Sequence, residues 1–227
     1  MPFENNTNYI IARTISDAWQ DAIWCCIRNG YDYKIEHGSY IGQIRRQLDH
    51  LTIRIAEPWT RPLAPLMPEG SGIPPTTSDE KIETYCYEYL ITDTKEDKED
   101  YTYGQYIQKQ FPRLIDILNT SRGNSNQACI AVGEPSCINL NDPPCLRLID
   151  FKVVNGQLNM SVFFRSWDGY AAFPENIGGL QLLKEYLLMH LNFPVKDGEI
   201  ICYSSGFHIY EMYFNIVNQL NVDKIGE

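Results

Sequence analysis

The sequence lacks the features that mark several classes of protein. No stretch of its 227 residues looks like a membrane span, and residues 1–6 lack the basic and apolar regions of a secretory signal. The seven cysteines are scattered without Cys-x-x-Cys spacing, which disfavours a zinc site and favours a reduced cytosolic compartment over a disulfide framework. The net charge of −10 argues against a nucleic-acid surface, although a local basic pocket is compatible with it. We therefore expect a cytoplasmic globular protein without a metal, a membrane or a nucleic acid as partner.

The most informative stretch is residues 141–156, which reads Asn-Asp-Pro-Pro-Cys, an apolar strand pattern and then Asn-Gly. Two consecutive prolines fix φ and remove two backbone donors, so the chain arrives extended and stiff at Cys145. Asn155-Gly156 is a strong signal for a tight hairpin, and residues 158–164 return as the partner strand. The hairpin therefore ties a thiol to a polar cluster at the end of the second strand: Arg165, Ser166, Trp167 and Asp168.

Apolar residues at helical spacing predict several helices. One follows a cap at Ser16 or Asp17 and ends before Gly30, one follows a capping box at residues 77–80, and one starts at Tyr103-Gly104 with an interruption at Pro112. The segment 180–191 is apolar on most of its surface, which predicts a buried central helix. Strands are expected at residues 51–55, 128–132 and 199–204, and the proline-rich segment 58–77 is a candidate site wall or linker.

Some polar residues allow two interpretations from the sequence alone. Arg45 and Arg46 are either a surface pair or an anion-binding pair. Asn176 either caps the central helix or reaches into a pocket. His208 and Tyr210 point the same way if their segment is extended, which suggests that both bind a ligand's hydroxyl group.

Four motifs then follow one another in the chain: Pro143-Pro144-Cys145, Phe164-Arg165-Ser166-Trp167-Asp168, Pro174-Glu175-Asn176-Ile177-Gly178-Gly179 and His208-Ile209-Tyr210. In this order and at these separations they resemble the thymidylate synthase family, which includes pyrimidine-nucleotide hydroxymethylases, and they look most like its short archaeal branch. The resemblance covers roughly residues 100–215. It implies a single α/β (α+β) domain over residues 1–227, with the thymidylate synthase fold, a bent mixed sheet and a buried central helix, and it implies a homodimer with the sheet at its interface.

The resemblance also implies three catalytic residues. Cys145 is the nucleophile that adds to C6 of a uracil ring. Tyr103, in a Tyr-Gly motif, lies near the proton removed from C5. Asp168 bonds the base through its backbone and helps to order a pterin cofactor.

Further residues would hold a nucleotide monophosphate. Arg165 and Ser166 contact the phosphate, and the cation of Arg165 also favours the Cys145 thiolate. Asn176 bonds the pyrimidine edge, and because an amide can donate to O4 while it accepts from N3–H, it favours uracil over cytosine. His208 and Tyr210 hold the sugar 3′-hydroxyl.

The chain departs from the family pattern at several positions. Leu146 stands where the family has a histidine, and residues 125–127 stand where it has the paired arginines that reach the partner's phosphate. The candidates for the missing phosphate ligand are Arg122, Arg45 and Arg46. The tryptophans that wall the folate site are not evident, and only residues 211–227 follow Tyr210, without the segment that closes over folate.

We therefore expect an enzyme of the C5-methyltransferase type that transfers a one-carbon unit to C5 of dUMP and forms dTMP. The expected donor is 5,10-methylenetetrahydrofolate or a related pterin, for example of the methanopterin type. Three alternatives stay open: a pyrimidine-nucleotide 5-hydroxymethylase, a C5-methylase of UMP or dUMP in a specialised pathway, and a nucleotide-binding protein without turnover.

Overall fold

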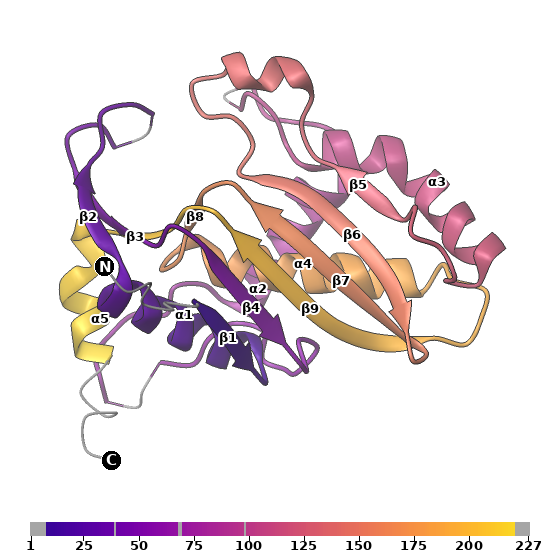
Figure 1. Cartoon of the computed structure of the whole chain (residues 1–227), viewed down its shortest axis with the longest axis horizontal. Coiled ribbons are helices and arrows are strands. Elements are labelled where there is room, and N and C mark those ends of the chain that lie inside the picture. Colours follow the sequence, from indigo (N-terminus) through magenta and orange to yellow (C-terminus); the bar gives the residue numbers. More distant parts are fainter. Residues whose placement is uncertain (1–7, 39, 68–69, 98, 221–227) are drawn as a thin grey trace, which may run out of the picture.

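A computed structural model describes residues 8–38, 40–67, 70–97 and 99–220, and it shows two mixed sheets and the helices that pack against them (Figure 1). The larger sheet has the strand order β1-β4-β9-β7-β6-β5. Its strands are Tyr9–Ala12 (β1), Leu51–Ile55 (β4), Cys129–Ala131 (β5), Leu146–Val154 (β6), Gln157–Phe164 (β7) and Lys196–Ser204 (β9). The smaller sheet has the order β2-β3-β10-β8. Its strands are Tyr31–Lys34 (β2), Ile44–Gln47 (β3), Trp167–Asp168 (β8) and Phe207–Tyr210 (β10).

The predicted hairpin is confirmed. Strands β6 and β7 pair antiparallel up to Val154 and Gln157, and the turn residues Asn155 and Gly156 have φ angles of 52° and 75°. Such positive values at both positions are what a tight two-residue hairpin turn requires. At the other end of the hairpin, the Arg165 N–H donates to the Cys145 carbonyl at 2.9 Å. The residue after β7 is therefore fixed beside the residue before β6.

Helix α4, Ala172–Leu188, is the predicted central helix. It buries residues on most sides and crosses behind β6, β7 and β9 in Figure 1. The helix begins earlier than expected because Pro174 stands in its first turn, where backbone N–H groups have no intrahelical acceptor. Asn176 consequently lies inside the helix, and its interpretation as the N-terminal cap is wrong.

The remaining helices differ from the predictions mainly at their starts. Helix α1 is capped by Thr14, not by Ser16 or Asp17: the Asp17 N–H donates to Oγ1 of Thr14 at 3.1 Å, and the Thr14 N–H donates to the Asp17 carboxylate at 3.0 Å. Ser78, not Thr77, caps α2. The third helix, α3, is continuous through Pro112. The bounds are Ile15–Asn29 (α1), Asp79–Tyr85 (α2), Cys86–Ile91 (η1, a π-helical continuation of α2), Gly104–Ser121 (α3), Pro135–Asn139 (η2), Glu211–Tyr213 (η3) and Phe214–Leu220 (α5).

One face of the larger sheet carries exposed apolar side chains. Strand register places Tyr9, Thr52, Tyr203, Phe163 and Leu148 in one row across β1, β4, β9, β7 and β6. Tyr9, Tyr203 and Leu148 are all exposed. We call this the outer sheet face; the opposite face packs against the core. In the four described ranges, no helix has the length and apolar character needed to cross a membrane.

Candidate active site

A cleft of about 570 Å³ opens where the Cys145 end of the hairpin meets the smaller sheet and the first turns of α4. The residues that line it include nine of those expected at a site: Arg45, Tyr103, Cys145, Arg165, Ser166, Asp168, Asn176, His208 and Tyr210. Two of them, Asp168 and His208, are brought side by side directly by the pairing of β8 with β10. Residues far apart in the chain therefore share one concave surface.

Two of the predicted arginines do not line this cleft. Side chains alternate along β3, and Arg46 faces away from Arg45, with Nε donating to Asp32 at 2.6 Å and the guanidinium over Phe214. Arg122 lies at the end of α3, where it adopts a left-handed conformation with φ 53°. The proline-rich segment 58–77 does not line the cleft either, so its interpretation as a site wall is wrong in the part that the structure describes.

Cys145 is half-buried beside two arginines. Burial raises the pKa of its thiol, the Asp142 carboxylate raises it further, and the cations of Arg165 and Arg45 lower it. The expected effect of Arg165 therefore has the right direction, but burial outweighs it. The thiol of the isolated chain is mostly protonated at neutral pH.

Arg165 is held by the Pro-Pro segment itself. Its Nε donates to the Pro144 carbonyl at 3.1 Å, and its Nη2 donates to the Pro143 carbonyl and to the Asp142 carboxylate. The prolines cannot donate backbone hydrogen bonds, but their carbonyls accept them. The segment that presents Cys145 also orients the cation next to it.

The hydroxyl of Tyr103 lies next to the backbone that follows Cys145. The Leu146 N–H donates to its hydroxyl at 3.2 Å, and burial, followed by the charge of Cys145, raises its pKa well above the usual range. Tyr103 is thus a neutral phenol that can still donate its proton. Tyr89 packs edge-on against it with ring centroids 5.0 Å apart.

Asn176 and Asp168 are each held by a donor. Nε1 of Trp167 donates to Oδ1 of Asn176 at 3.1 Å, which leaves the amide nitrogen for other acceptors. The Asp168 carboxylate accepts from the N–H groups of Tyr170 at 3.0 Å and Ala171 at 3.2 Å. Burial raises the Asp168 pKa, and these two N–H groups oppose that effect.

The protonation of His208 follows from its surroundings. Its Nδ1 lies 2.9 Å from the Gly206 carbonyl, which only accepts, so Nδ1 carries the proton and Nε2 is an acceptor. Nε2 is buried and has no partner among the described residues. Burial lowers the pKa of His208 from 6.5 to about 4, and the ring is therefore neutral at physiological pH. An unpaired buried acceptor in a cleft calls for a hydroxyl or N–H donor from a ligand.

Arg45 and Tyr210 complete this end of the cleft. The His208 and Tyr210 rings are 4.9 Å apart, and the Arg45 guanidinium lies 4.7 Å from the centre of the Tyr33 ring. Nε of Arg45 is buried without a partner among the described residues. Burial raises the pKa of Tyr210 to about 12, so its hydroxyl stays protonated.

Several cleft residues were not predicted from the sequence. Gln47 lies two positions after Arg45 on β3, and strand alternation could have placed it on the same face. Tyr85 and Tyr89 are four residues apart and stack with centroids 5.6 Å apart, which helical spacing could have indicated. His37 comes from the loop between β2 and β3, and no local signal marks it.

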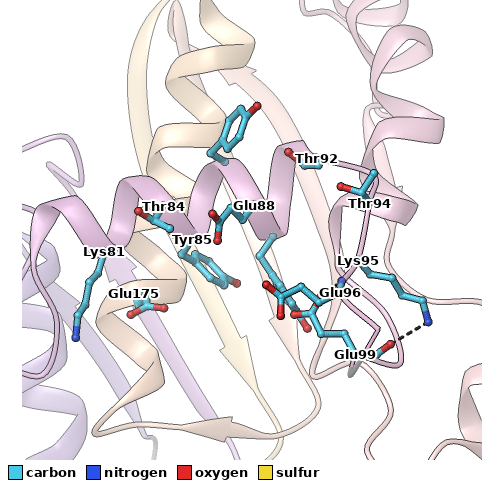
Figure 2. A pocket seen from close by; sticks show the side chains of 12 residues that line it. Lys81, Thr84, Tyr85, Glu88, Thr92, Thr94, Lys95, Glu96, Glu99 and Glu175 are labelled. Carbon is cyan, nitrogen blue, oxygen red and sulfur yellow. Dashed lines mark hydrogen bonds between the residues drawn. The ribbon is translucent and has the colours of Figure 1, made fainter.

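A second cavity of about 800 Å³ adjoins the cleft and shares Tyr85 and Tyr89 as wall residues. It lies along α2 and η1, and Figure 2 shows its labelled polar residues. They include Lys81, Glu88, Lys95, Glu96, Glu99 and Glu175. The described residues contain no group of three or more His, Cys, Asp or Glu side chains that could hold a metal ion.

Comparison with known proteins identifies the family. The family model described as thymidylate synthase matches residues 77–224. This chain belongs to the thymidylate synthase family. Relatives named "Putative thymidylate synthase" cover nearly the whole chain. The one from Methanosarcina barkeri is 31% identical over 92% of this chain and 94% of its own length. The one from Methanosarcina acetivorans is 30% identical over 93% and 95%.

Comparison with a solved structure confirms that this chain has the thymidylate synthase fold. Thermostable thymidylate synthase A from Bacillus subtilis superimposes with a TM-score of 0.68 over 92% of this chain and 84% of its own, at 14% identity. The expected family and the mixed α/β fold are thus correct. Membership of this family also supports a transferase activity on a nucleotide substrate with a folate-type cofactor.

Proposed function

We propose that this protein transfers a one-carbon unit to C5 of dUMP and forms dTMP. One observation carries the proposal: a single cleft holds a thiol, an amide and two arginines, namely Cys145, Asn176, Arg165 and Arg45. A thiol is the nucleophile that a uracil ring needs at C6, an amide matches the pyrimidine edge, and guanidinium groups bind phosphate.

The nucleotide would be bound at three points. Arg165, Ser166 and Arg45 hold the phosphate, which makes Arg45 our choice among the candidates for the missing ligand. His208 accepts a hydrogen bond from a sugar hydroxyl through its unpaired Nε2, and Tyr210 lies next to it. Both residues recognise a hydroxyl that ribose and deoxyribose share, so they do not select between the two sugars.

The chemistry begins when the Cys145 thiolate adds to C6. The Sγ–C6 bond forms, and the electrons of the C5=C6 bond move to O4, where Asn176 donates a hydrogen bond to the enolate. C5 would then bond to the donor's carbon as the bond of that carbon to the donor nitrogen breaks, and the C5 proton would leave on the side of Tyr103, whose neutral phenol can relay it. Cleavage of the Sγ–C6 bond restores the ring double bond and the thiolate.

The second cavity fits a pterin donor. Tyr85 and Tyr89 offer aromatic faces for a flat ring, and the carboxylates of Glu88 and Glu175 can accept from its N–H groups. A methylenetetrahydrofolate or methanopterin-type donor supplies the one-carbon unit and the hydride that reduces it. Asp168, the last residue of β8 and part of the cleft lining, would help to order the donor next to the nucleotide.

We also infer a homodimer formed through the outer sheet face. Its row of exposed apolar side chains, including Tyr9, Tyr203 and Leu148, is the kind of surface that an obligate interface covers. All seven cysteines are free thiols, which supports a reducing, cytoplasmic location.

Product analysis tests the proposed function. The purified protein is incubated with methylenetetrahydrofolate and, in separate reactions, with dUMP, UMP, dCMP or CMP, and the nucleotides are identified by mass spectrometry. We expect dTMP and dihydrofolate from dUMP, and no product from the Cys145→Ser variant. A 5-hydroxymethyl product would replace the proposal by the hydroxymethylase alternative, and binding without any product would favour a nucleotide-binding protein.

A further inference from the structure

Asp142 lines the cleft and forms an ion pair with Arg165. Its Oδ1 lies 3.3 Å from Nη2 of Arg165, and its side chain is 62% exposed while that of Arg165 is 34% exposed. The proline that follows restricts the backbone of Asp142 to extended conformations, so the stiff segment that presents Cys145 also presents this carboxylate. The carboxylate therefore contacts the same guanidinium that the proposed function assigns to a phosphate.

The hydrogen bonds of Arg165 make this contact a competition for one nitrogen. Nε donates to the Pro144 carbonyl, and Nη2 donates both to the Pro143 carbonyl and to the Asp142 carboxylate. A phosphate binds an arginine most strongly through two parallel N–H groups, and either such pair of a guanidinium includes an N–H of Nη2. Of the three acceptors, only the Asp142 carboxylate belongs to a side chain and can turn away. A bidentate phosphate must therefore displace Asp142.

The charges at this end of the cleft favour the same conclusion. Arg45 lies close enough to Arg165 for the two cations to repel: burial is the main cause that lowers the pKa of Arg45, and the charge of Arg165 adds to it. Two neighbouring cations attract an anion, and Asp142 supplies one from the chain itself. A phosphate and a carboxylate at one guanidinium would repel each other. Binding of the phosphate is thus coupled to release of Asp142.

We propose that Asp142 is a specificity-determining residue: its carboxylate competes with the nucleotide phosphate for Arg165 and reduces the preference of the cleft for a nucleoside monophosphate over the nucleoside. The inference rests on the proposed function, because it takes Arg165 to be a phosphate ligand. The ion pair is partly exposed, so breaking it costs little. A phosphate monoester, with a charge of about −1.5 to −2 at pH 7, can therefore displace the carboxylate.

The test compares the equilibrium binding of dUMP and of deoxyuridine, which lacks only the phosphate, to the wild-type protein and to Asp142→Asn, without a one-carbon donor. The variant keeps a side-chain oxygen that can accept from Arg165 and removes the charge. We expect the ratio of dUMP affinity to deoxyuridine affinity to rise about threefold to fivefold, the effect of one partly exposed ion pair, while the affinity for deoxyuridine stays the same.

Asp116→Asn is the matched control. It removes the charge of another exposed aspartate that pairs with an arginine, Arg113, and this pair lies on α3 and does not line the cleft. The control changes the net charge of the protein by the same amount as Asp142→Asn. Its ratio of the two affinities should equal that of the wild type, because only Asp142 shares an arginine with the phosphate.

An unchanged ratio in Asp142→Asn, or an equal rise in Asp116→Asn, would overturn the competition while the proposed function stands. A wild-type protein that binds neither dUMP nor deoxyuridine would overturn the proposed function. Inorganic phosphate then still tests the competition: it should raise the melting temperature of Asp142→Asn more than that of the wild type and of Asp116→Asn, and equal shifts would overturn it. Asp142→Ser takes the place of Asp142→Asn in both measurements if that variant does not fold.

Discussion

Neutral His208 makes the stability of this protein sensitive to acid. The side chain is 2% exposed, and burial lowers its pKa from 6.5 to about 4. Between these values the unfolded chain binds a proton that the folded chain does not, so the free energy of unfolding falls as the pH falls. Linkage gives a loss from His208 alone of about 1 kcal/mol at pH 6, about 2 kcal/mol at pH 5 and about 3 kcal/mol at pH 4, relative to pH 8.

His208→Gln isolates this contribution, because glutamine does not titrate in this range. Urea unfolding of both proteins, followed by tryptophan fluorescence at pH 8, 6 and 5, gives the difference in unfolding free energy at each pH. We expect that difference to move by about 2 kcal/mol in favour of the variant between pH 8 and pH 5. A difference that stays constant over this range would refute the argument that His208 is buried and neutral. Raised carboxyl pKa values, such as that of Asp168, act on both proteins and cancel in the comparison.

The other predictions concern the nucleophile, a buried ion pair and the outer sheet face. Asp142→Asn removes a carboxylate that raises the Cys145 pKa, so iodoacetamide at pH 7.5 should label Cys145 about twofold to fivefold faster, as read by peptide mapping; an equal or slower rate would contradict this. Lys184 is fully buried with Nζ 2.8 Å from the Asp197 carboxylate, and Lys184→Met should lower the unfolding free energy by about 3 kcal/mol in urea, with partial recovery in the double variant Lys184→Met/Asp197→Leu. A loss below about 1 kcal/mol would show that the pair is not desolvated. Tyr203→Glu places a charge in the middle of the outer sheet face. If the wild type forms the proposed dimer through this face, sedimentation should show a dimer for the wild type and a monomer for the variant; a variant that stays dimeric would place the interface elsewhere.

Local signals predicted the part of the fold that positions the nucleophile. Asn155-Gly156 adopts the backbone angles of a tight turn almost regardless of its surroundings, and the alternating residues on either side set the register. The two prolines before Cys145 fix their own φ angles, and this restriction does not depend on contacts with the rest of the chain. For these reasons the hairpin could be predicted without knowledge of the rest of the chain.

Long-range pairing was not predictable in the same way. Arg45 reaches the cleft only because β3 pairs with β10, where Tyr210 lies opposite Arg45. Neither strand contains a sequence signal that identifies the other as its partner. The start of α4 was also missed, since a proline in a first turn looks like a helix boundary when only the sequence is considered. That error hid the position of Asn176 one turn before Gly179. The place of Asn176 in the cleft, where Nε1 of Trp167 donates to its Oδ1, depends on that position and could not be foreseen.

The direction of the pKa shift of Cys145 could not be predicted from the sequence either. The residues around it indicated a thiolate stabilised by Arg165, but burial and Asp142 raise the thiol pKa by more than the two arginines lower it. The extent of burial depends on the packed structure and cannot be estimated from neighbouring residues in the chain.

Release of tritium from C5 of labelled dUMP tests the central claim most directly. The wild-type protein and Cys145→Ser are incubated with the labelled nucleotide and methylenetetrahydrofolate, and tritium in water is counted over time. The proposed mechanism predicts release by the wild type at a rate that matches dTMP formation, and no release by Cys145→Ser. Equal release by both proteins would contradict a Cys145 adduct. No release from labelled dUMP, UMP, dCMP or CMP would contradict the proposal that the protein is an enzyme of this type.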